Sequence, residues 1–335
     1  MSVKNDFPSL ASLAAQAFLA NPQGALQSYR DSKYDSYTET VKHVTEFDVA
    51  RMQSDLAKLD LPQNIFIYTS GSDGKLEKAN RHESPVELLV ICDSETKPEV
   101  TKRVEEFVAQ DAIKIDHRVE WKDLSKETLV VCNITNVVCP SRFMHNLPLH
   151  GSEMQRGELT LKFVNELQSM TTSNRRKFID KFIKVHTKQM NDVISGADTR
   201  DVNLSTGELS YSGMGRKATK YPLLRPVQYK LDLVLVDAIR TKKLTPKNYA
   251  TLLLEMPRTV PEQIDYMAEK KLLPKLTPDD IRDLKAAYKL GLFYFQTAQH
   301  VISADKDSNP ITFVVPDKAE LSKAFADTQR ILNKL

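Results

Sequence analysis

The chain has 335 residues, of which 41% are hydrophobic and 27% are charged. This composition is ordinary for a globular protein, and the length allows two domains. Forty-seven basic and 44 acidic residues leave a net charge of +3, which is too small to indicate nucleic-acid or membrane binding by itself. Ten glycines and one tryptophan disfavour β-sandwiches and propellers and suit a helix-rich chain.

Three cysteines, Cys92, Cys132 and Cys139, fall within or beside β-like runs. An odd number of such cysteines indicates buried thiols in a reducing compartment, so we expect a cytoplasmic protein. No segment reaches the roughly 20 apolar residues that span a bilayer. The run SLASLAAQAFLA, residues 9–20, leaves a secreted protein as the alternative, although Gln16 interrupts the run and its Leu/Phe spacing suits an amphipathic helix.

Residues 1–60 are predicted to form a helical N-terminal arm, because apolar residues recur at helical spacing until Pro62. Residues 61–152 then change character and predict an α/β head. Short runs rich in β-branched or aromatic residues indicate strands, namely NIFIYTS, PVELLVICD, AIKIDHRVEW, TLVVCN and NVVCP. Between the second and third runs, KPEVTKRVEEFVAQ has the spacing of an amphipathic helix.

Residues 153–335 are predicted to form a C-terminal helical bundle. The segment Thr277-Pro278-Asp279-Asp280 is a strong helix start, with proline in the first turn and acids that complement the helix dipole. A polar stretch at 197–222 indicates a loop or hairpin. Helices are expected at 154–170, 175–194, 225–242, 246–256, 261–271, 278–303 and 317–332. The fold class is therefore α+β, with a mixed sheet and helices in the head.

One loop of the head carries a chemical pattern. An apolar strand leads into Gly71-Ser72, and Glu87 lies just inside the next strand. Small residues let backbone N–H groups approach phosphate closely, and carboxylates hold Mg²⁺ in phosphoryl-transfer sites. However, Pro85 occupies the position where a second acid would share the strand face of Glu87. From spacing alone we favour a glycine-containing hairpin whose edge strand begins with a proline.

The loop resembles a family motif. GSDGKLEK is similar to the G-S-E-G-R-x-E-Q signature of the nucleotidyltransferases related to PII uridylyltransferase and glutamine-synthetase adenylyltransferase. Asp73 stands where that signature usually has glutamate, and SPVELLVIC resembles the S-D-x-D-L-L-V strand, with Glu87 on the second acid and Pro85 on the first. The residues that fall on the signature are Gly71, Ser72, Gly74, Lys75 and Glu77.

Two later segments extend the resemblance, which covers roughly residues 60–305. VVCPSRFMHNLPLHGSEMQRGEL resembles a D-x-R strand and Gly turn, with Arg142 on the arginine, Gly151 on the turn and Pro140 in place of the acid. The segments KYPLLRPVQYKLDLVLVDAIRTKK and 258–302 resemble the linking segment and the closing helices. Their matching positions are mostly packing residues: Thr259, Ile264, Leu284, Ala287, Tyr288 and Leu290.

The resemblance implies a nucleotidyltransferase-type fold that uses Mg²⁺ to move a nucleoside monophosphate from a nucleoside triphosphate to a protein or small-molecule acceptor. Glu87 would be the catalytic residue and a metal ligand, and Glu83 is a candidate substitute ligand because the loop is about two residues longer than in the family. A solvated basic loop is the alternative for the two lysines near the cleft. The implied nucleotide-binding residues are Gly71, Ser72, Gly74, Lys75, Arg142, Lys217 and Lys220.

Two of the three implied metal carboxylates are replaced by Pro85 and Pro140. One acid would bind Mg²⁺ poorly, because octahedral Mg²⁺ needs oxygen ligands to offset its dehydration cost. Our hypothesis is therefore a catalytically degenerate relative that binds a nucleotide or a protein partner in a regulatory role. The alternative is an active metal-dependent nucleotidyltransferase. His145 and His150 are interpreted as loop residues, because the histidines show no metal-site spacing.

Overall fold

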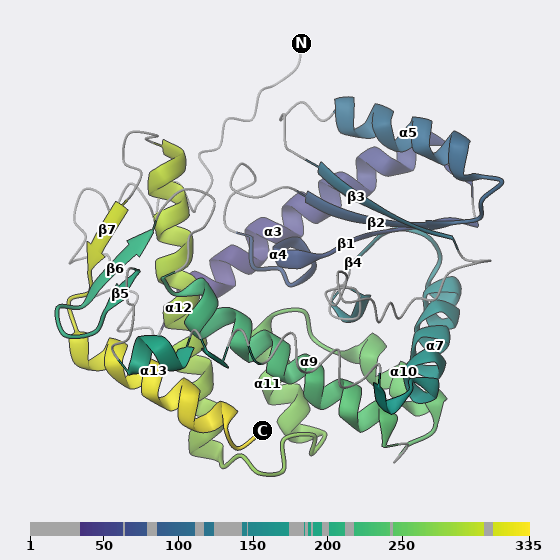
Figure 1. Ribbon diagram of the computed structural model, residues 1–335. Coiled ribbons are helices and arrows are strands. Elements are labelled where there is room, and N and C mark those ends of the chain that lie inside the picture. The colour runs from purple at the N-terminus through teal and green to yellow at the C-terminus, as the bar shows by residue number, and fades with distance from the viewer. Residues whose placement is uncertain are drawn as a thin grey trace.

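The computed structural model describes residues 34–62, 64–78, 86–110, 117–123, 143–145, 147–173, 184, 187–188, 190–195, 201–211, 218–241, 244–304 and 311–335. Within these ranges the chain is a mixed α+β protein, as its sequence predicts, with one larger sheet and many helices (Figure 1). The strands predicted from TLVVCN and NVVCP lie outside the described residues, as does most of the helix predicted at 175–194.

The larger sheet has the strand order β3-β2-β1-β4 and is mixed. Its strands are β1 (Phe66–Thr69), β2 (Val86–Cys92), β3 (His117–Asp123) and β4 (Leu147–His150). β1 pairs antiparallel with β2 and β4, whereas β2 and β3 are parallel. β4 was not predicted as a strand. It contains Pro148, which is compatible with the position of β4 at the edge of the described strands.

The two faces of this sheet are covered by different helices. Phe66 and Tyr68 of β1 belong to the core that the sheet shares with the C-terminal helices, and Ile67 faces the opposite way. On that opposite face the core includes residues of α5 (Lys97–Gln110). Strand alternation thus gives the sheet one face toward α5 and one toward the helical body.

Helix α3 (Asp35–Leu56) confirms the helical character predicted for the N-terminal segment over its described part. Tyr37 and Val41 near its start belong to the core on the body side, whereas Met52 and Leu56 near its end pack in the core beneath α5. A 3₁₀ turn, Ala57–Leu59, follows the helix. The helix therefore packs along both parts of the molecule and does not project as a separate arm.

The body helices begin at residues with clear capping signals. Side chains of Ser152, Thr245, Thr259 and Asp317 each accept a backbone N–H at a helix start. In the described part of the chain, no helix is both long and apolar enough to cross a bilayer. The helices are α7 (Glu153–Ser169), α9 (Arg225–Arg240), α10 (Pro246–Glu255), α11 (Val260–Glu269), α12 (Pro278–Ala304) and α13 (Lys318–Leu332).

A second, antiparallel sheet lies beside α12 and α13 (Figure 1). Its hairpin, β5 (Val202–Asn203) and β6 (Glu208–Tyr211), falls in the stretch predicted as a loop or hairpin. Its third strand, β7 (Ile311–Val314), was not predicted and pairs with β6 across about 100 residues of sequence. The C-terminal region is therefore not purely helical. β7 was not predictable because strand pairing over that distance leaves no local signal in the sequence.

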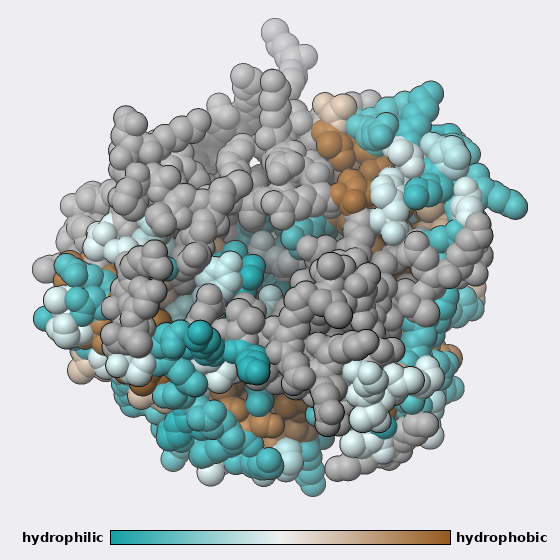
Figure 2. Space-filling view, in the orientation of Figure 1, coloured by the Kyte–Doolittle hydropathy of each residue, from teal (hydrophilic) through white to brown (hydrophobic). Residues whose placement is uncertain are grey.

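On the face drawn in Figure 2, hydrophilic residues cover most of the described surface, with smaller hydrophobic areas between them. The most exposed large apolar side chains, Phe47, Met154 and Val314, come from α3, α7 and β7. Single exposed apolar residues are common on soluble proteins. They give no basis for a docking surface.

Candidate functional site

The structure brings Gly71 and Glu87 together, as the strand-loop-strand pattern predicts. β1 runs into a short helical turn, α4 (Gly71–Gly74), and the N–H of Ser70 donates to the carbonyl of Glu87 at 3.0 Å. The Ser70 hydroxyl also donates to Oε2 of Glu87 at 3.4 Å. Gly71 has φ +67°, and a Cβ added there would lie 3.0 Å from that same oxygen. Glycine is therefore favoured at 71 by both backbone conformation and space.

The other residues of the loop differ in accessibility. Ser72 and Lys75 are partly exposed, so a ligand could reach them. Gly74 is buried, and a Cβ there would lie only 2.2 Å from the carbonyl oxygen of His145. Packing against this backbone explains the glycine, so we leave Gly74 out of the ligand-binding set. Asp73 is also buried and forms an ion pair with Lys78 at 3.1 Å.

The start of α9 carries Arg225 and Tyr229, which lie within electrostatic range of each other. Burial raises the pKa of Tyr229 on α9, Arg225 opposes the shift, and Asp232, Tyr221 and, to the smallest extent, Glu87 raise the pKa further. The guanidinium of Arg225 lies 4.7 Å from the ring centroid of Tyr221. Glu87 is therefore within electrostatic range of α9, but the candidate site itself is defined by the contacts between the Gly71 loop and Glu87.

Lys220, a predicted nucleotide-binding residue, lies on the body side. It begins a π-helical turn, Lys220–Leu224, immediately before α9, and its ammonium lies 4.9 Å from the ring centroid of Phe295. This cation–π contact accounts for part of its environment. The turn leads directly into Arg225, so two basic residues lie at the start of α9.

The described residues do not fit a resident magnesium ion. Among them, no group of three His, Cys, Asp or Glu side chains gathers as metal ligands would. Glu87 contributes one carboxylate beside Gly71, and Mg²⁺ held by protein requires near-octahedral oxygen coordination. We therefore derive no metal-dependent step. The predicted residues Glu83, Arg142 and Lys217 lie outside the described part of the chain, as do Pro85 and Pro140.

Glu77, which falls on the signature, has a structural role. Its buried carboxylate accepts hydrogen bonds from the N–H of Val260 at 3.0 Å and from the hydroxyl of Tyr288 at 2.7 Å. Burial raises the pKa of Glu77, although both hydrogen bonds act in the opposite direction. The hydroxyl of Tyr288 in turn accepts from Nε2 of Gln228 at 2.6 Å. Glu77 thus connects the loop to α11, α12 and α9.

The residues around Glu77 are fixed from further directions. The hydroxyl of Thr45 on α3 donates to the carbonyl of Lys78 at 2.9 Å and accepts the N–H of Lys78 at 3.1 Å. Nε2 of Gln296 on α12 donates to the carbonyl of Glu77. These contacts fix the backbone of Glu77 and Lys78, the residues that follow the Gly71–Gly74 turn.

A buried polar network around His145 was not predicted from the sequence. His145, which was interpreted as a loop residue, is buried and its Nε2 contacts Oδ1 of Asp232 on α9. Nε2 of Gln263 on α11 lies 3.1 Å from Nδ1 of the same ring. One available signal was Asp232 itself, an acid within the apolar run LDLVLV. The network joins the turn before β4 to two body helices.

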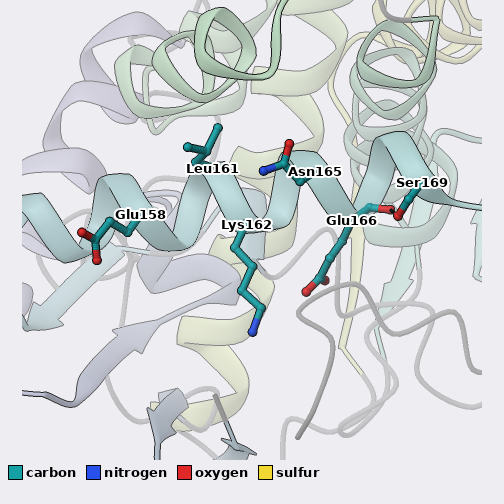
Figure 3. Close-up of a pocket in the computed structure, with 6 residues that line it drawn as sticks. All are labelled: Glu158, Leu161, Lys162, Asn165, Glu166 and Ser169. Atoms are coloured by element: carbon teal, nitrogen blue, oxygen red, sulfur yellow. Dashed lines mark hydrogen bonds between the residues drawn. The ribbon is translucent and has the colours of Figure 1, made fainter. Parts of the chain in front are cut away.

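A cavity of about 490 Å³ runs along α7, and neither Gly71 nor Glu87 lines it (Figure 3). In this view Lys162 and Glu166 extend from one side of the helix, and Leu161 and Asn165 extend from the other. The described lining residues all come from α7, and none is a predicted site residue. Because their polar groups do not converge, we do not place the functional site there.

A scan against models of known protein families finds no match to this chain, and a search of curated proteins finds none either. The resemblance to nucleotidyltransferases therefore rests on the sequence motifs, and what it implies is a matter for proposal.

Proposed function

We propose that this chain is a nucleotidyltransferase-like protein with a regulatory role. It binds a nucleoside triphosphate at the Gly71-Ser72 loop and does not transfer the nucleoside monophosphate to an acceptor. The observation that carries this proposal is the position of Gly71 directly beside the Glu87 carboxylate. Binding without transfer is supported by Pro85 and Pro140 at positions where the family has metal-binding acids.

The accessible groups suit a phosphate-bearing ligand. Ser72 and Lys75 are partly exposed on the loop, and Arg225 and Lys220 add positive charge on the body side. Glu87 alone would repel phosphate. We therefore expect nucleotide binding to require a divalent cation that accompanies the nucleotide.

An active metal-dependent nucleotidyltransferase is the second candidate. The closeness of Gly71 and Glu87 favours it equally, because transfer enzymes need that same arrangement of loop and carboxylate. The acceptor would be a protein or a small molecule. The two candidates differ in whether the nucleoside monophosphate of the bound nucleotide becomes covalently attached to an acceptor.

The test measures binding and transfer on the same protein. The full chain is incubated with ATP, UTP, GTP or CTP, each labelled in its nucleoside monophosphate part, with Mg²⁺, with Mn²⁺ or without metal. Thermal stability reports binding, and covalent label reports transfer. Glu87→Gln removes the charge of the loop carboxylate. The matched control is Glu106→Gln, at an exposed position on α5, which covers the opposite face of the sheet.

Metal-dependent stabilisation without label, lost in Glu87→Gln and kept in Glu106→Gln, is the expected result. Label transfer that disappears in Glu87→Gln would replace our proposal with the enzymatic candidate. If no nucleotide raises the melting temperature and no label is transferred, nucleotide function is ruled out. A protein partner would then be the regulatory ligand to seek.

A further inference from the structure

The side-chain amide of Gln263, buried on α11, fixes which ring nitrogen of His145 carries the proton. Its Nε2 lies 2.9 Å from the carbonyl oxygen of Arg258, 3.1 Å from that of Pro257 and 3.1 Å from Nδ1 of His145. Carbonyl oxygens only accept hydrogen bonds, so the amide turns its nitrogen and not its oxygen toward them. Nδ1 of His145 therefore faces a donor and acts as an acceptor without a proton.

The opposite nitrogen of the ring carries the proton. In a neutral imidazole one nitrogen accepts and the other donates. The proton of His145 is accordingly on Nε2, which contacts Oδ1 of Asp232 on α9. Both side chains are buried. The ring thus connects two helices in one tautomer, because it donates to α9 and accepts from α11.

A second proton on the ring conflicts with this arrangement. It would place an N–H on Nδ1, opposite the N–H of Gln263, and two donors cannot form a hydrogen bond with each other. The amide relieves this conflict by turning its oxygen toward the ring or by moving away. In either case the carbonyls of Pro257 and Arg258 lose their donor. Histidine is the side chain that ordinarily changes charge between about pH 5 and 8, so this contact can respond to pH.

Both ends of the contact adjoin the glycine loop. The segment held by Gln263 leads into α11, whose first residue, Val260, donates its N–H to Glu77 at 3.0 Å. On the other side, the carbonyl oxygen of His145 lies against Gly74, where an added Cβ would be 2.2 Å away. A change at the ring is therefore one residue contact away from the loop in two directions.

Other charged groups lie on the elements that adjoin the ring. Asp73 forms its ion pair with Lys78 at 3.1 Å. Burial raises the pKa of Glu77, so acid acts on that carboxylate as well. A test must therefore separate the ring from Glu77. The titratable and charged groups concerned are Asp232 and Tyr229 on α9, Asp73, Glu77 and Lys78 in the loop, and Arg258 before α11.

We propose that His145 and Gln263 form a proton-sensitive latch. While the ring is neutral, the latch holds the segment Pro257-Arg258, and uptake of a second proton by the ring releases that segment. Release loosens the start of α11 and, through the hydrogen bond to Glu77, the support of the glycine loop. Nucleotide binding at the loop should then weaken. This last consequence rests on the function proposed above, whereas the latch itself does not.

The first experiment uses the unmodified full chain without nucleotide, between about pH 8 and pH 5. Deuterium exchange at the ring carbon between the two nitrogens, followed by peptide mass spectrometry, gives the pH midpoint at which His145 is protonated. Backbone amide exchange in the same samples, corrected for its intrinsic pH dependence, reports opening of residues 258–263. Both should change with one midpoint. Amide exchange should rise roughly tenfold below it, because two carbonyls lose their donor.

Three variants separate the ring from other titrating groups. His145→Gln keeps both contacts without a proton to gain, because glutamine can donate to Asp232 and offer its oxygen to Gln263. Gln263→Glu cannot donate to the two carbonyls and represents the released state. The control is His43→Gln, which removes an imidazole that is 65% exposed on α3. We expect protection that is independent of pH in His145→Gln, fast exchange at every pH in Gln263→Glu, and unchanged behaviour in His43→Gln.

The consequence for the loop is measured separately. Thermal shifts with ATP, UTP, GTP or CTP and Mg²⁺ are compared at about pH 7.5 and pH 5.5. The shift should shrink at the lower pH in the unmodified chain and stay constant in His145→Gln. If no nucleotide stabilises the chain at either pH, the proposed function fails, and the exchange data alone decide on the latch. A constant shift while the latch opens would overturn its link to the loop.

The exchange data can also overturn the latch itself. A His145 ring that does not titrate in this range would do so, as would different midpoints for the ring and for residues 258–263. An equal pH response in His145→Gln and in the unmodified chain would assign the opening to another group, with Glu77 as the first to examine.

Discussion

The hydroxyl of Tyr288 donates a 2.7 Å hydrogen bond to Oε2 of Glu77, which lies 211 positions earlier in the chain. Both residues are buried, and the other carboxylate oxygen of Glu77 accepts the N–H of Val260. Glu77 ends the glycine loop, whereas Tyr288 lies within α12. This pair therefore ties the position of the loop to the packing of the body.

Replacing Tyr288 by phenylalanine should lower the free energy of unfolding by about 1.5–3 kcal/mol, because a buried carboxylate loses a donor. Gln228 also loses its acceptor. Urea denaturation monitored by circular dichroism measures the loss. Tyr266→Phe is the matched control, since that hydroxyl bonds a carbonyl at 3.3 Å in a partly exposed setting. Equal losses in the two variants would contradict a special contribution from Tyr288.

The titration of Glu77 should appear in the pH dependence of stability. Burial raises the pKa of Glu77 above its ordinary value of 4.5, so the folded protein binds this proton more tightly than the unfolded chain does. The contribution of Glu77 is then fully present below pH 4.5 and declines as the pH rises through the folded-state pKa. Denaturation of the unmodified chain and of Glu77→Gln should therefore be compared from pH 4 upward.

The unmodified chain should lose stability relative to Glu77→Gln as the pH increases. A difference that stays constant over this range would show that the pKa of Glu77 is not raised. A difference that changes in the opposite direction would show that the hydrogen bonds from Val260 and Tyr288 outweigh burial.

Three glycine-to-alanine substitutions should separate packing from ligand binding. Gly74→Ala should be the most destabilising, because its Cβ would lie 2.2 Å from a backbone oxygen. Gly71→Ala should cost about 1 kcal/mol for its left-handed conformation and should also abolish nucleotide-induced stabilisation. Gly157→Ala, in α7 with nothing within 4 Å of the new methyl, should gain about 0.5–1 kcal/mol.

The same denaturation and thermal-shift measurements test all three variants. If Gly71→Ala still responds to nucleotide like the unmodified chain, the loop is not the binding site. If Gly74→Ala is no less stable than Gly71→Ala, close packing does not explain the glycine at 74.

Elements with local signals could be predicted from the sequence. The helix expected at 278–303 is observed as α12, because Thr277 and Pro278 mark its start and its apolar spacing continues along its length. The closeness of Gly71 and Glu87 was also predictable, since adjacent strands joined by a loop commonly pair.

Features that depend on distant partners could not be predicted in this way. β7 has only four residues, and its pairing with β6 becomes visible only in three dimensions. His145 follows no pattern that distinguishes a loop histidine from a buried one, because its partners come from α9 and α11. The packing role of Gly74 depends on the same turn.

Asp280 should make the contact between α12 and α13 sensitive to acid. Its carboxylate accepts from Lys334 at 2.6 Å, from the N–H of Thr277 at 3.0 Å and from Arg330 at 2.5 Å. These donors, Lys334 first, lower the pKa of Asp280 well below its ordinary value of 3.8. The resulting stability is present above pH 3.8 and is lost as the pH falls toward the folded-state pKa.

Asp280→Asn should therefore lower the free energy of unfolding by about 1–2 kcal/mol at neutral pH. The deficit should shrink once the pH falls below 3.8, because the unmodified chain then loses the same interaction. Asp265→Asn provides the control, since Asp265 pairs with Lys285 and its side chain is 53% exposed. A deficit that persists unchanged at low pH would contradict the lowered pKa.

The buried pair of His145 and Asp232 should be strongly coupled. Oδ1 of Asp232 contacts the histidine, and its Oδ2 has no hydrogen-bond partner within the described part of the chain. His145→Ala would leave a buried carboxylate without its donor, so we expect a loss of about 3 kcal/mol or more. Removing both side chains removes that penalty. In a double-mutant cycle with Asp232→Ala, the double variant should therefore be at least about 1 kcal/mol more stable than the sum of the single losses predicts. Strict additivity by urea denaturation would show that the two side chains contribute separately, and that other contacts hold the turn before β4 against α9.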